Sequence, residues 1–128
     1  MLALTACAQI DDSFCNEYAS AWNDFAEVRD GSSATAQEVI DASKTMRDRW
    51  AKLSADEDVP SYARNMVGIA ESSFMSAWTA SSSFDRKAYQ QSWINGRDYI
   101  ARQCSEAGFD IEFNGEDVPI ESPRLGAD

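Results

Sequence analysis

The stretch from Phe84 to Phe109 constrains the fold of this chain most, because its start, its apolar face and its end are all readable. Asp85 is expected to cap the first helical turn, with Phe84 packing onto Tyr89. Gly108 is expected to end the helix in the left-handed backbone conformation, after which Phe109 folds back on the last turn. Between these signals, apolar and small residues recur at three- and four-residue steps, at Tyr89, Trp93, Gly96, Ile100, Cys104 and Ala107. This stretch therefore predicts one long amphipathic helix.

Three further helices are predicted upstream. The first runs from Ser13 to Asp30, with an acidic or hydroxyl cap at 11–13. The second opens with the capping box Thr35 to Glu38 and ends before the acidic loop 55–58. The third covers 59–80, with Pro60 in its first turn. Its wide apolar face is expected to consist of Tyr62, Met66, Ile69, Ala70, Phe74, Ala77 and Trp78.

After Gly108 the apolar period changes from 3.6 to 2. Phe109, Ile111 and Phe113 alternate with acidic residues, and Asn114-Gly115 is a strong signal for a two-residue turn. The pattern predicts a β-hairpin that pairs Ile111 with Val118 and Phe109 with Ile120.

Together these segments predict an all-α protein, an up-down-up-down four-helix bundle with a short C-terminal β-hairpin. We expect a tether at 1–12, the bundle at 13–108, the hairpin at 109–121 and a flexible tail at 122–128. A chain of 128 residues is long enough for one such domain.

Charge and composition exclude several functions. The net charge of −11 disfavours binding to nucleic acid and to anionic membrane surfaces. The chain has no His, which removes the commonest general base, and it has no nucleophile elbow or Gly-rich phosphate loop. No apolar run is long enough to cross a bilayer. We therefore expect no catalysis and no cofactor.

The N-terminal residues Leu4-Thr5-Ala6-Cys7 resemble a bacterial lipobox, in which a peptidase cuts before a Cys that is then acylated. The basic and fully apolar parts of a signal peptide do not precede them. Three interpretations follow: the sequence is truncated at its start, its assigned start lies too late, or the match is a chance one within an apolar lead-in to the first helix. Together with Cys15 and Cys104, this motif makes the chain resemble small helical lipoproteins of Gram-positive bacteria or their phages. The resemblance implies lipidation at Cys7 and a location on the outer face of the cytoplasmic membrane.

The three cysteines of the chain can be divided between lipid and disulfide. If Cys7 carries lipid, Cys15 and Cys104 remain. An up-down-up-down bundle places the start of its first helix beside the end of its fourth, so the topology brings these two residues together. We expect a Cys15–Cys104 disulfide; the alternative is two buried, reduced thiols.

The C-terminal acidic residues also match the spacing of a Ca²⁺-binding loop. Its ligands would be Asp110, Glu112, Asn114 and Glu121, with Gly115 at the sharp turn. Pro119 prevents the exit helix that such a loop requires, so we favour the hairpin and no metal.

The leading functional hypothesis is a non-catalytic cell-surface lipoprotein that binds or blocks an unknown envelope partner, as in superinfection exclusion or envelope scaffolding. The alternatives are an extracytoplasmic Ca²⁺-dependent binding module and a cytosolic helical interaction protein. We expect the chain to associate with the membrane only through the lipid anchor. The bundle end away from that anchor carries uncharged loops, so we expect the partner at Ser32, Ser33, Ser82, Ser83 and Phe84. The alternative is that these loops are merely short connectors.

Overall fold

The computed structural model describes residues 10–115 and 118–123. These residues form four helices and no strand. The helices are α1 (Asp12–Asp30), α2 (Ala36–Ala55), α3 (Ser61–Trp78) and α4 (Ser83–Glu106). The all-α class and the number of helices are confirmed, with bounds that differ from those predicted by no more than a few residues.

Most of the predicted helix ends are confirmed. The Asp11 carboxylate accepts a hydrogen bond from the backbone N–H of Phe14 at the start of α1. Both hydrogen bonds of the capping box between Thr35 and Glu38 are present at the start of α2. These contacts satisfy backbone N–H groups that have no partner inside a helix, which is why they fix where each helix begins.

The start of α4 differs from the prediction. Its cap is Ser82, whose hydroxyl accepts from the backbone N–H of Asp85, so Asp85 lies inside the first turn. Phe84 does not pack onto Tyr89, because 80% of Phe84 is exposed to solvent. The predicted end of α4 is confirmed, since Gly108 is left-handed and the Phe109 N–H returns to the Cys104 carbonyl.

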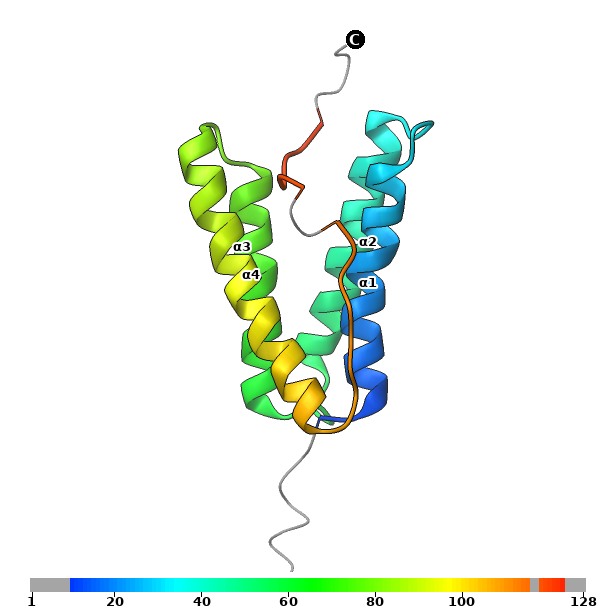
Figure 1. Ribbon diagram of the computed structural model, residues 1–128, viewed down its shortest axis with the longest axis vertical. Coiled ribbons are helices and arrows are strands. Elements are labelled where there is room, and N and C mark those ends of the chain that lie inside the picture. Colours follow the sequence, from blue (N-terminus) through cyan, green and yellow to red (C-terminus); the bar gives the residue numbers. More distant parts are fainter. Residues whose placement is uncertain (1–9, 116–117, 124–128) are drawn as a thin grey trace, which may run out of the picture.

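The four helices alternate in direction and form two antiparallel pairs, α1 with α2 and α3 with α4 (Figure 1). The pairs converge at the end where α1 begins and α4 ends, and they diverge toward the loops at 31–35 and 79–82 (Figure 1). Direct contact is extensive within each pair, whereas α1 and α4 touch little. Space for another segment is thus left between α1 and α4.

The predicted disulfide joins the converging ends. Cys15 and Cys104 are bonded through their sulfur atoms, their Cα atoms are 6.0 Å apart, and both side chains are fully buried. The bond connects the first turn of α1 to the last turn of α4.

Aromatic side chains dominate the core. The rings of Trp22 and Trp93 are 4.3 Å apart and connect α1 to α4. The largest fully buried side chains come from all four helices and the C-terminal segment: Trp22, Trp50, Trp93, Tyr18, Phe25, Phe74, Met46, Ile100 and Ile120. Ile10, expected in the tether, is buried as well, so the packed body begins before α1.

The buried face of α3 is as predicted at Ala70, Phe74, Ala77 and Trp78, but it is rotated in the first half of the helix. Tyr62 and Ile69 are 43% and 50% exposed, while Ala63 and Val67 are buried in their place. Small residues on this face allow α3 and α4 to approach closely, as an added Cβ on Gly96 would lie 3.9 Å from Ala70.

The predicted β-hairpin is not formed in the described part of the chain. Residues 109–115 and 118–123, here called the C-terminal segment, have no strand pairing and follow α1 before passing between the two helix pairs (Figure 1). The predicted turn at Asn114-Gly115 is present, and residues 116–117, predicted to begin the second strand, lie outside the described residues. The backbone of the segment bonds instead to side chains of α1 and α4, which replace the partner strand.

Candidate functional site

The first half of the C-terminal segment is held by α1. The Asn23 side chain donates to the Glu112 carbonyl at 2.9 Å and accepts from the Asn114 N–H at 2.8 Å. The Trp22 indole donates to the Asn114 carbonyl at 2.7 Å. Phe113, between the bonded residues, meets the Tyr18 ring edge-on at 5.8 Å. Backbone and side chain are therefore both fixed here.

The turn at Gly115 approaches the end of α1. Arg29 lies over the Trp22 ring at 5.4 Å and donates to the Gly115 carbonyl at 2.8 Å. Gly115 has φ +61°, a conformation that residues with a Cβ rarely adopt. An added Cβ would also lie 2.7 Å from the Asp30 carboxylate, so both conformation and space favour Gly.

The second half of the segment is held by α4 and by the end of α3. The Gln90 side chain donates to the Val118 carbonyl at 3.0 Å and accepts from the Ile120 N–H at 2.8 Å. Ser122 N–H donates to the Trp78 carbonyl at 3.3 Å. The predicted flexible tail is thus bound at least as far as its first residue; residues 124–128 lie outside the described residues.

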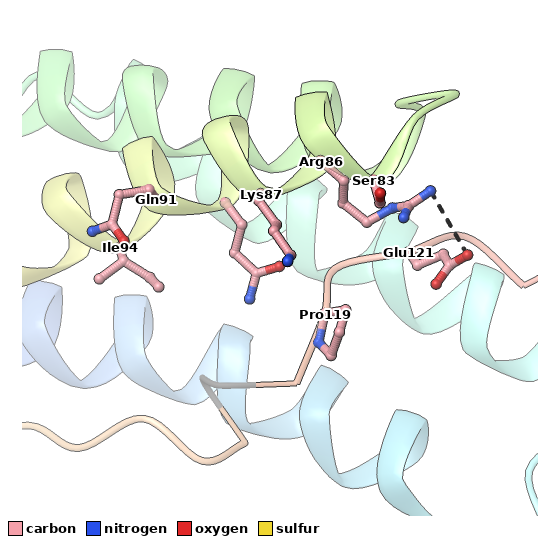
Figure 2. Close-up of a pocket in the computed structure, with 8 residues that line it drawn as sticks. Ser83, Arg86, Lys87, Gln91, Ile94, Pro119 and Glu121 are labelled. Atoms are coloured by element: carbon pink, nitrogen blue, oxygen red, sulfur yellow. Dashed lines mark ion pairs between the residues drawn. The ribbon is translucent and has the colours of Figure 1, made fainter.

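A groove of about 450 Å³ lies between the first half of α4 and this second half (Figure 2). We call it the α4 groove. Its lining is Ser83, Arg86, Lys87, Gln90, Gln91, Ile94, Pro119 and Glu121. Long polar side chains from α4 and an apolar base give the groove the composition of a site for a partly polar ligand.

Two cations and one carboxylate set the charge of the α4 groove. Arg86 lies 3.7 Å from the Glu121 carboxylate, drawn as the dashed line in Figure 2, and also donates to the Ala80 carbonyl at 3.3 Å. Lys87 is exposed one residue further on. In a chain of net charge −11, this groove is a place where an acidic group meets positive charge.

The predicted partner-binding residues are at the end of the molecule away from the disulfide, but they do not form one patch. Ser32 and Ser33 are exposed at the α1–α2 loop, while Ser82, Ser83 and Phe84 are exposed where α4 begins. The two loops occupy opposite corners of that end (Figure 1). Ser83 lines the α4 groove.

The Ca²⁺ candidates are not brought together. No group of three or more acidic or sulfur side chains gathers as a metal site within residues 10–115 and 118–123. Glu121 faces Arg86, and the backbone of Asn114 is bonded to Trp22 and Asn23. Asp110 and Glu112 are exposed along α1. Cys7, the predicted lipidation site, lies outside the described residues.

Shifted pKa values occur away from the groove. The Arg49 guanidinium, hydrogen-bonded at 2.7 and 2.8 Å, lowers the pKa of Glu17 despite its partial burial. Complete burial raises the pKa of Tyr18. Both groups connect helices or fill the core, which accounts for the shifts without a catalytic role.

Sequence reasoning missed Asn23, Gln90 and Arg86. They lie on the polar faces of predicted helices, where amides and cations are ordinary surface residues. Their partners in the C-terminal segment are 28 or more residues away in sequence. No local pattern marks such contacts.

The sequence matches no known protein-family model, and neither curated proteins nor solved structures give a significant match. None of the helices in the described part of the chain has the length and apolar character needed to span a bilayer.

Proposed function

We propose that this chain is a non-catalytic, lipid-anchored protein of the extracytoplasmic surface that binds an envelope partner through the end away from its disulfide. The observation that carries the proposal is the buried Cys15–Cys104 bond. Structural disulfides persist in oxidising compartments outside the cytoplasm. The bond also uses two of three cysteines and leaves Cys7 for another role.

The burial of Ile10 supports a short distance between a lipid on Cys7 and the helical body. If Cys7 carries lipid, only the residues between Cys7 and Ile10 separate them, a reach of roughly 10 Å. The disulfide end then lies beside the membrane, and the diverging ends of the helix pairs face outward. Phe84, a large apolar side chain that is 80% exposed at that outer end, supports a partner contact there.

Palmitate labelling tests the anchor. Expressed behind a signal sequence in a Gram-positive host, the chain is expected to incorporate labelled palmitate and to sediment with membranes. Cys7→Ser should lose both properties, while the Cys15→Ser/Cys104→Ser double variant keeps the label. Unlabelled, soluble protein in the cytoplasm with free Cys15 and Cys104 thiols contradicts the proposal.

Site-specific crosslinking tests the outer end. A photo-crosslinking residue at position 32 or 84 should capture an envelope protein in intact cells. Position 57, exposed in the α2–α3 loop at the membrane end, is the matched control. Capture from position 57 alone would place the partner at the disulfide end and contradict the proposal.

A further inference from the structure

Two side-chain amides hold the C-terminal segment in the same way. Asn23 bonds to the carbonyl of Glu112 and the N–H of Asn114, and Gln90 bonds to the carbonyl of Val118 and the N–H of Ile120. Each amide therefore joins the C=O of one residue to the N–H two residues later. We call this arrangement a paired amide contact.

A paired amide contact recognises an extended backbone and not a particular side chain. In an extended chain the C=O of one residue and the N–H two residues later lie on the same edge. The residue between them bonds on the other edge, which is why Pro119, with no N–H, is accommodated beside Gln90. Selectivity then comes from pockets for alternate side chains.

The two halves of the segment are held unequally. Asn23, Trp22 and Arg29 together give the first half four hydrogen bonds of 2.7–2.9 Å. The second half has the two bonds to Gln90, a 3.3 Å bond at Ser122 and a 3.7 Å ion pair at Glu121. Ile120, 1% exposed, is its main apolar anchor. We therefore expect another peptide to displace the second half of the segment more readily than the first half.

Charge indicates what would replace it. Arg86 and Lys87 line the α4 groove, and the segment itself offers Glu121 to Arg86 only at 3.7 Å. The groove retains about 450 Å³ that residues 118–123 do not fill. An acidic chain that fills this space would meet both cations.

We propose that the Gln90 contact and the α4 groove form a binding site for an extended, acidic peptide segment of the partner, with residues 118–123 as its exchangeable resident. The incoming segment places an apolar side chain where Ile120 lies and a carboxylate at Arg86 and Lys87. This inference takes from the proposed function only that a partner exists. Its test uses purified chain, so it is independent of lipid attachment.

The probe is a fluorescent synthetic peptide with the sequence of residues 116–124. In the wild-type chain the resident segment competes, so the apparent affinity is reduced by the fraction of time the site is open. Ile120→Asp in the full chain weakens the resident, and the peptide should then bind about tenfold more tightly than to wild type. Adding Gln90→Ala to that variant should remove most of this binding. Gln37→Ala is the matched control, because the exposed Gln37 amide bonds within α2 to Asp41 and does not line the α4 groove.

Glu121→Arg provides a second open variant, as the Glu121 side chain is 60% exposed and its replacement leaves the core intact. It should also bind the peptide more tightly than wild type, and a peptide with Asp in place of Ile120 should not bind either variant. The proposal is overturned if neither folded variant binds at about millimolar peptide. It is also overturned if Gln90→Ala and Gln37→Ala act alike, or if light scattering shows a dimer that the peptide dissociates, since a second copy would then be the occupant.

Discussion

Among the single residues of the core, Trp93 connects the two helix pairs through its contact with Trp22. It is fully buried, its ring is 4.3 Å from that of Trp22, and Arg97 lies over it at 5.5 Å. Its Nε1 has no hydrogen-bond partner among the described residues. The contribution of Trp93 is therefore packing.

Trp93→Ala should lower the free energy of unfolding by about 3–5 kcal/mol, because it leaves a large cavity between α1 and α4. Trp93→Phe should cost much less, since no hydrogen bond is lost. Urea denaturation measures both. A loss below about 1 kcal/mol for the Ala variant would contradict the central position of this ring.

The Glu17–Arg49 pair predicts part of the acid sensitivity. Because Arg49 lowers the pKa of Glu17 in the folded state, the pair stabilises above the ordinary value of 4.5, and the stabilisation is lost as the pH falls below it. Glu17→Gln should flatten the stability profile in that range by less than about 1 kcal/mol, because the pair is partly exposed.

Glu71 is the control of opposite sign. Burial raises its pKa, so its ionisation opposes folding at neutral pH, and Glu71→Gln should stabilise the chain there. Thermal unfolding at several pH values separates the two carboxylates. Parallel shifts in both variants would contradict these assignments.

At the scale of elements, the helices follow from local signals and the C-terminal segment does not. Asp11, Thr35 and Gly108 act on neighbours within a few residues, so the sequence is sufficient to place those helix ends. The alternation of apolar and acidic residues after Gly108 correctly indicates extended backbone. The predicted turn at Asn114-Gly115 is also present. The partners of that backbone are side chains 28 or more residues away, which periodicity does not encode.

The rotated face of α3 has a different cause. Apolar residues surround more of α3 than its neighbours can cover, so periodicity alone leaves its rotation open. The close approach of Gly96 in α4 to Ala70 selects the side of α3 that carries Ala70 and leaves Ile69 exposed. Packing against a second helix decides such a choice, and a single-helix pattern cannot include it.

Two glycines test the turn at element scale. Gly115→Ala should destabilise by about 1–2 kcal/mol, because of its positive φ and the nearby Asp30 carboxylate. Gly68→Ala, inside α3 with nothing near an added Cβ, should stabilise by about 0.5–1 kcal/mol. Denaturation midpoints compare them, and equal effects would show that the turn has no conformational preference.

At the scale of the whole molecule, the disulfide closes the bundle. Cys15 and Cys104 are separated by 89 residues, so removing the bond should cost up to about 4–5 kcal/mol in the chain-entropy view. The Cys15→Ala/Cys104→Ala variant should melt at least about 10 °C lower than the oxidised chain. Calorimetry with and without reductant gives the comparison; an unchanged melting temperature would mean that packing alone fixes these ends.

The same bond determines how the molecule carries tension. A pull applied between an N-terminal anchor and the C-terminal segment passes from Cys15 directly to Cys104, so the chain between these two cysteines bears no load. Force instead reaches residues 109–123, where the contacts of Gln90, Arg29 and Asn23 lie one after another from the C-terminal side. These contacts would break in that order, beginning at the C-terminal side, while the four helices stay folded. Under mechanical stress the C-terminal segment would thus leave the α4 groove before the helical body unfolds.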